Sequence, residues 1–178
     1  MFARPALQSR RRRLKRLRCI RPLRAAMGKT SMSVPPVVDA ERQAGGKPLW
    51  TAIILAGQRP EGDPMAAHCQ VAYKALIPIA GQTMLERVTR ALLASADIGR
   101  IVIMGQSPEA LKAGLDSDLG ENQRIGFAQS GDGIATSIHK IAGSALAPWP
   151  VLVTTADNAL LTGEILDCFF RAHTGQDV

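Results

Sequence analysis

Three residues that could do phosphate chemistry stand next to apolar segments. Gly57 follows the apolar run 52–55, Asp157 follows the apolar segment 150–154, and Lys74 has apolar neighbours. A glycine lets the backbone approach a phosphate closely, and a lysine among apolar residues is costly to desolvate unless an anion meets it. A carboxylate at the end of a strand can hold Mg²⁺ beside phosphate oxygens. These features predict a phosphate site; the alternatives are a plain turn, a surface lysine and a turn aspartate.

The elements that must position these residues alternate along the chain. Four short apolar segments are predicted to be strands, at 50–55, 100–104, 125–128 and 150–154. Helices are predicted over 83–96, from Ser107, from Ile134 to Ala145 and from Thr162. Thr83 and Glu86 have the spacing of a capping box, and Ser107-Pro108 is a typical helix start. The stretches between Gln58 and Tyr73 and over 115–124 are polar and predict loops.

Short, continuously apolar strands that alternate with helices are typical of a parallel sheet buried on both sides. The predicted fold class is therefore α/β, a Rossmann-like, mostly parallel sheet with helices on both faces. Ligands of such sheets bind beyond the carboxyl ends of the strands. Four turns would gather there, at residues 56–62, 106–107, 130–133 and 155–158.

Two segments resemble the signature of the MobA-like NTP transferase superfamily. They are Leu-Ala-Gly at 55–57 and Lys-Ala-Leu-Ile-Pro-Ile-Ala-Gly at 74–81. The family pattern is LAGG, a variable loop and KxLxPxxGxPxL. Gln58 stands where the family has its second glycine, and residues 59–64 replace the usual Arg-Met-Gly element. After the fourth predicted strand, Asp157 matches the family's metal-binding aspartate, although Ala159 replaces the proline that usually follows.

The resemblance implies a nucleotidyltransferase that moves a nucleoside monophosphate from an NTP to a phosphorylated or cofactor acceptor and releases pyrophosphate. Lys74 would be the catalytic residue, and Asp157 would hold the cofactor Mg²⁺. The nucleotide-binding residues would be Leu55, Ala56, Gly57, Arg59, Gly131 and Ser137. For Gly131 and Ser137, a plain helix start is an equally good interpretation.

The resemblance covers residues 51–173, whereas members of the family continue through further strands. The sequence therefore predicts a nucleotidyltransferase-like domain over 49–178 that is C-terminally incomplete. The alternative function is a non-catalytic nucleotide-binding or regulatory module, or an inactive fragment of such an enzyme.

Residues 1–48 are predicted to form a basic disordered tail and linker. Residues 1–29 hold eleven of the 22 basic residues and no acid, so the rest holds eleven basic and fifteen acidic residues. A basic patch on the folded domain is therefore not indicated, and nucleic-acid binding is expected only through the tail. There are two other interpretations. One is a start codon that has been assigned too early, so that translation begins at Met27 or Met32, and the other is that the basic run is an organelle-targeting segment.

Three widely spaced cysteines give no disulfide framework and suit a reducing compartment. No apolar run approaches the roughly 18 residues that a membrane helix needs. We therefore expect a cytoplasmic protein without a membrane partner, whose partners are an NTP and a small phosphorylated acceptor.

Overall fold

The computed structural model describes residues 46–59, 61–131 and 133–174. The predicted tail at 1–48 lies almost entirely outside them. The described part contains a four-stranded parallel sheet whose strand order is β5-β4-β1-β6. Its strands are β1 (Trp50–Leu55), β4 (Ile98–Gly105), β5 (Ile125–Gln129) and β6 (Val151–Thr155). The predicted strands are thus confirmed, with β4 longer at both ends than the sequence indicated.

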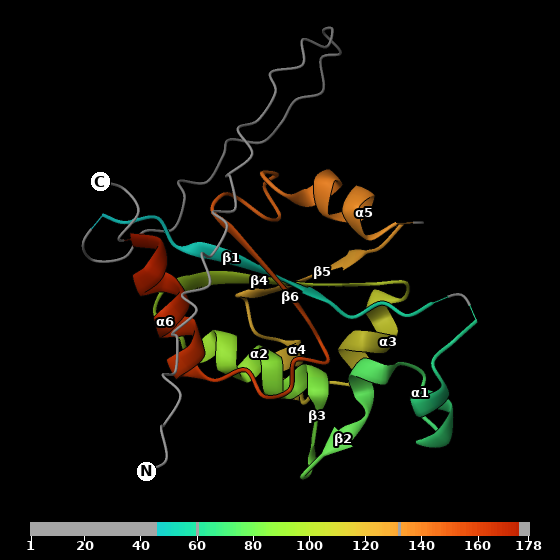
Figure 1. Ribbon diagram of the computed structural model, residues 1–178. Helices are drawn as coiled ribbons and strands as arrows, with labels where there is room; N and C mark the ends of the chain where they lie inside the picture. Colours follow the sequence, from blue (N-terminus) through green and yellow to red (C-terminus); the bar gives the residue numbers. More distant parts are fainter. Residues whose placement is uncertain (1–45, 60, 132, 175–178) are drawn as a thin grey trace, which may run out of the picture. The chain divides into compact units, whose positions relative to one another are not determined.

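Helices cover both faces of this sheet (Figure 1). On one face lies α5 (Ile134–Ile141), and on the other lie α2 (Met84–Ala94), α3 (Pro108–Ala113), α4 (Ser117–Gly120) and α6 (Gly163–Thr174). Alternate residues of β1 point into two separate cores: Ile54 packs with Leu85 and Leu92 of α2, whereas Ile53 packs with Ile138 of α5. Since both faces are buried, β1 is apolar throughout, and the predicted α/β fold class is confirmed.

The helix α2 begins as its sequence predicts. The Thr83 hydroxyl accepts a hydrogen bond from the Glu86 N–H at 3.1 Å, and the Glu86 carboxylate accepts one from the Thr83 N–H at 2.7 Å. Glu86 is only 5 % exposed, and its second oxygen accepts a hydrogen bond from the Asp116 N–H at 2.8 Å. One carboxylate therefore caps α2 and also anchors the start of α4.

Three sequence predictions about helices were wrong: two helices lie in predicted loops, and one helix ends earlier than predicted. The polar stretch before Lys74 contains α1 (Pro64–His68), because Asp63 caps two N–H groups and Pro64 occupies the first helical position. The predicted loop 115–124 contains the short helix α4. The helix α5 ends at Ile141 rather than near Ala145, because Gly143 adopts a positive φ of 82°.

The segment between α1 and α2 is held by local structure. It contains the 3₁₀ helix η1 (Lys74–Leu76) and a hairpin formed by β2 (Pro78–Ile79) and β3 (Gln82–Thr83). Ala80 and Gly81 form its two-residue turn, both with positive φ, as a tight hairpin requires. This hairpin leads directly into α2, so Lys74 sits on a short, ordered connection.

Candidate functional site

The centre of the site is an ion pair between Lys74 and Asp157. The Lys74 Nζ lies 2.8 Å from the Asp157 Oδ2 and donates a hydrogen bond to it. Lys74 comes from η1, and Asp157 follows β6 by two residues. Their side chains are 34 % and 44 % exposed, so a ligand can reach both. The anion beside Lys74 in this structure is the carboxylate of Asp157.

The sheet topology explains why these residues meet. β1 and β6 are parallel neighbours in the sheet, with Leu55 opposite Thr155, and the Ala156 N–H bonds to the Leu55 carbonyl at 2.9 Å. The chain runs from β1 to β4 and β5 on one side, and β6 lies on the other side of β1. Such a reversal of strand order forms a crevice at the carboxyl ends of the strands, where ligands bind.

Electrostatics keep both partners charged at neutral pH. The hydrogen bond from Lys74, supported by one from the Thr155 side chain, lowers the pKa of Asp157 below its ordinary value. The same hydrogen bond and the charge of Asp157 raise the pKa of Lys74. Thus the pair stays ionised from the acidic range, below which Asp157 protonates, to the alkaline range, above which Lys74 loses its proton.

The predicted nucleotide loop lies beside this pair. Leu55 is half-buried and ends β1, while Ala56 is buried and its N–H bonds to the Met104 carbonyl of β4 at 2.8 Å. Gly57 and Arg59 are exposed, so they present backbone and a guanidinium to the solvent side of the loop. The structure therefore brings this loop, Lys74 and Asp157 to one edge of the sheet.

Gly131 follows the end of β5, and Ser137 lies in the first turns of α5. β5 is two strand positions from β1, or about 10 Å at the usual strand spacing. Ser137 is 3 % exposed. Its hydroxyl donates to the Gly133 carbonyl at 2.7 Å and accepts from the Gly131 N–H at 2.9 Å. In this structure Ser137 therefore braces the turn before α5. Within the same turn, the buried Ser130 Oγ has no hydrogen-bond partner among the described residues.

The sequence argument missed two residues in this region, Gln58 and Gln106. Gln58 was noted only as a replacement for glycine, and Gln106 only as part of a turn. In the structure the Gln106 side chain bonds to the backbone of Gln58 at 2.7 and 3.1 Å. No local sequence signal marks such a contact, because 48 residues separate the two glutamines.

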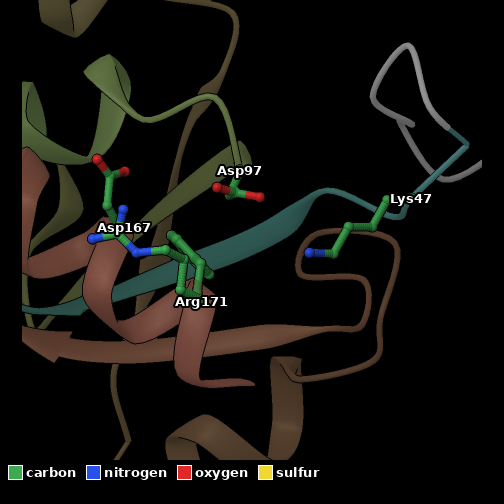
Figure 2. Close-up of a pocket in the computed structure, with 5 residues that line it drawn as sticks. Lys47, Asp97, Asp167 and Arg171 are labelled. Carbon is green, nitrogen blue, oxygen red and sulfur yellow. The ribbon is translucent and has the colours of Figure 1, made fainter. Parts of the chain in front are cut away.

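The described residues contain no group of three or more His, Cys, Asp or Glu side chains placed to hold a metal ion. Among the same residues, no helix is both long and apolar enough to cross a bilayer. A separate pocket of about 230 Å³ (Figure 2) lies near the amino ends of β1 and β4, away from the Gly57 loop. Its lining consists of Lys47, Asp97, Asp167, Phe170 and Arg171, and it includes no predicted site residue.

Fold and site together define a class of protein. A parallel sheet ends in a glycine-bearing loop, and a lysine and an aspartate from distant segments meet beside it. This is the arrangement of α/β domains that bind phosphate-bearing ligands at a reversal of strand order.

Comparison with known protein families identifies the family within this class. The chain belongs to the family of the MobA-like NTP transferase domain, whose family model matches residues 52–178. The predicted resemblance is therefore confirmed, and nucleotidyl transfer is the general activity that the family supports. A comparison with curated proteins finds no match.

Solved structures agree with this fold. The crystal structure of 4-diphosphocytidyl-2C-methyl-D-erythritol synthase from Anaerococcus prevotii DSM 20548 is similar, with a TM-score of 0.52 and 16 % sequence identity. The match covers 70 % of this chain and 50 % of that chain, so this chain matches about half the length of its neighbour. At this level of identity the likeness shows the fold.

Proposed function

We propose that this chain transfers a nucleoside monophosphate from an NTP to a phosphorylated acceptor and releases pyrophosphate. The observation that carries the proposal is the Lys74–Asp157 ion pair. It joins residues 83 positions apart at 2.8 Å, at the carboxyl ends of β1 and β6. Both side chains are accessible and lie beside a glycine-bearing loop, so a phosphate-bearing ligand can reach them.

In the proposed reaction, Lys74 neutralises the charge of the triphosphate and of the transition state. An acceptor oxygen attacks the α-phosphorus in line, the bond from that phosphorus to the bridging oxygen breaks, and pyrophosphate leaves with the electron pair. Positioning and preorganised charge supply most of the rate in such transfers. The backbone of Leu55, Ala56 and Gly57 would hold the nucleotide, with the exposed Arg59 as a second positive charge.

The turn before α5 would receive the base and sugar of the nucleotide. Gly131 provides backbone there, and Ser137 would act by fixing the shape of the turn, since its hydroxyl already has two partners. The buried Ser130 Oγ, which has no hydrogen-bond partner among the residues that the structure describes, supports a polar ligand close to this turn, because a buried hydroxyl without a partner is costly.

The donor set at Asp157 fits Mg²⁺. Mg²⁺ is usually held by one or two carboxylates together with substrate phosphates and water, so a site built on one accessible carboxylate is compatible with it. When bound, Mg²⁺ would withdraw charge from the phosphate oxygens of the NTP. Asp157 would have to exchange its partner Lys74 for the ion, which frees the lysine for the triphosphate.

We also propose a cytoplasmic location. Cys69 and Cys168 are exposed free thiols, as expected for a reducing compartment, and the proposed substrates are cytosolic metabolites by chemical class.

The test is calorimetric titration of the chain with each of the four NTPs in the presence of Mg²⁺, compared with a Lys74→Met variant. Lys112→Met is the matched control, because Lys112 is an exposed lysine of α3 without an ion pair among the described residues. We expect one NTP to bind to the wild-type and control proteins, and to bind more weakly to Lys74→Met. Equal NTP binding by all three proteins would contradict the role of Lys74, and no binding to any of them would contradict a nucleotide site.

A further inference from the structure

The Gln106 side chain forms a two-bond pair with the backbone of the predicted nucleotide loop. The Gln58 N–H donates to the Gln106 Oε1 at 3.1 Å, and the Gln106 Nε2 donates to the Gln58 carbonyl at 2.7 Å. Gln106 directly follows β4, and β4 is the neighbour of β1. One carboxamide from the adjacent strand therefore satisfies both backbone groups of the residue after Gly57.

Further contacts extend this arrangement in two directions. The Gln58 Nε2 donates to the carbonyl of Ala72 at 3.0 Å, two residues before Lys74. The Gln129 Nε2, at the end of β5, donates to the Gln106 carbonyl at 3.4 Å. The loop after β1 is thus tied to the ends of two other strands and to the segment that carries the proposed catalytic lysine.

The same contact limits the space for a side chain at residue 57. Gly57 does not have a positive φ, so its backbone conformation is open to other residues. A Cβ at this position would lie 3.2 Å from both the Nε2 and the Oε1 of Gln106. That distance is tighter than ordinary van der Waals contact, so a side chain at 57 would push the carboxamide away from Gln58. The Gln106 carboxamide is therefore the neighbour that has to shift, by a few tenths of an ångström, if residue 57 carries a Cβ.

We infer that Gln106 is a positioning residue for the nucleotide donor: its carboxamide holds the Gly57–Gln58 backbone in the conformation that receives the NTP. This inference rests on the proposed function. It assigns a role to Gln106 and to Gln58, the residue that departs from the family pattern, and it makes Gly57 the partner of Gln106. Removing the carboxamide loosens the loop and weakens NTP binding, while the Lys74–Asp157 pair stays in place.

The first test compares Gln106→Met, which keeps the length of the side chain and removes its amide, with Gln123→Met. Gln123 is an exposed glutamine whose side chain makes no hydrogen bond to the Gly57 loop within the described part of the chain, so it serves as the matched control. Hydrogen exchange of the Gln58 amide, followed by NMR, reports on the pair without any nucleotide. We expect exchange at Gln58 to become at least about tenfold faster in Gln106→Met, as loss of its hydrogen-bond acceptor allows, and to stay unchanged in Gln123→Met.

NTP affinity is the second readout. Two lost hydrogen bonds of ordinary strength correspond to a roughly ten- to thirtyfold increase in the dissociation constant for Gln106→Met. An unchanged rate of Gln58 exchange, or an unchanged affinity in a wild-type protein that does bind NTP, would overturn the inference alone. Absence of NTP binding by the wild-type protein would instead contradict the proposed function. The hydrogen-exchange experiment would still report whether Gln106 holds the loop.

A double-mutant cycle separates the steric contact between residue 57 and Gln106 from an unrelated loss of stability. Gly57→Ala and Gln106→Ala are made singly and together, and urea unfolding is measured for all four proteins. Because the added methyl group meets only the Gln106 amide within 3.5 Å, Gly57→Ala should destabilise the wild-type protein and cost clearly less in the Gln106→Ala background. If the losses of unfolding free energy in the two single variants simply add up in the double variant, the steric contact between residue 57 and Gln106 would be contradicted.

Discussion

Replacing Lys74 by methionine should separate the catalytic role of this lysine from its role in stability. Both partners of the Lys74–Asp157 pair are partly exposed, at 34 % and 44 % of their side-chain surface. Ion pairs of this exposure contribute roughly 0.2–1 kcal/mol to the free energy of unfolding, because water and salt screen them. Methionine also keeps most of the apolar stem. We therefore expect Lys74→Met to lose less than about 1 kcal/mol of unfolding free energy.

The catalytic effect should be much larger. Loss of one preorganised electrostatic donor at a reacting centre costs on the order of 10²–10³ in kcat, or about 2.7–4 kcal/mol. Pyrophosphate release at saturating NTP measures kcat, and urea unfolding measures stability, for wild type, Lys74→Met and the control Lys112→Met. A loss in kcat below about threefold would refute the role of Lys74. A loss of stability large enough to unfold the variant under the assay conditions would instead contradict the small stability effect expected for this exposed ion pair.

Three further predictions concern Asp157 and Glu86. Asp157→Asn should abolish any Mg²⁺-dependent increase in NTP affinity, measured by calorimetry with and without the ion; an unchanged Mg²⁺ effect would place the metal elsewhere. The stability that the ion pair contributes should be present above the unfolded-state pKa of Asp157 and should be lost as the pH falls below about 4, because the pKa of this carboxyl is lowered in the folded protein. The difference in urea stability between wild type and Asp157→Asn should therefore shrink toward zero in acid, and a difference that grows there would contradict the pairing. Glu86→Ala should cost about 2–3 kcal/mol of unfolding free energy, because the buried carboxylate satisfies two backbone N–H groups, at the starts of α2 and α4; Glu109→Ala, on the exposed surface of α3, is the control, and equal losses in the two variants would contradict this explanation.

Much of the fold could be predicted because its signals are local. The continuous apolar run of β1 marks a strand buried on both faces, and the Thr83–Glu86 spacing marks the first turn of α2. A local signal was also overlooked: Asp63-Pro64 is a helix start of the same kind as Ser107-Pro108, and it explains α1. By contrast, the residue that precedes α4, Asp116, donates its N–H to Glu86, which lies 30 residues earlier, so no local pattern reveals this contact.

The site was predictable in part for the same reason. Lys74 and Asp157 could each be chosen as candidates from their immediate neighbours in the sequence. Lys74 and Asp157 form an ion pair with each other because β6 lies next to β1. This neighbourhood is a property of the strand order, which the local sequence does not show. The contacts of Gln106 are likewise tertiary, since its partner Gln58 lies 48 residues earlier. The hydrogen bonds of Ser137 are local, to residues four and six positions earlier, and the sequence interpretation as a plain helix start is close to them.

The most direct test of the account is pyrophosphate release by the wild-type chain, with Mg²⁺ and each of the four NTPs, against a panel of phosphorylated acceptors. We expect release with one NTP that depends on an acceptor, on Mg²⁺ and on Lys74. Binding of an NTP without release from any combination would contradict nucleotidyl transfer by this chain and favour a nucleotide-binding module.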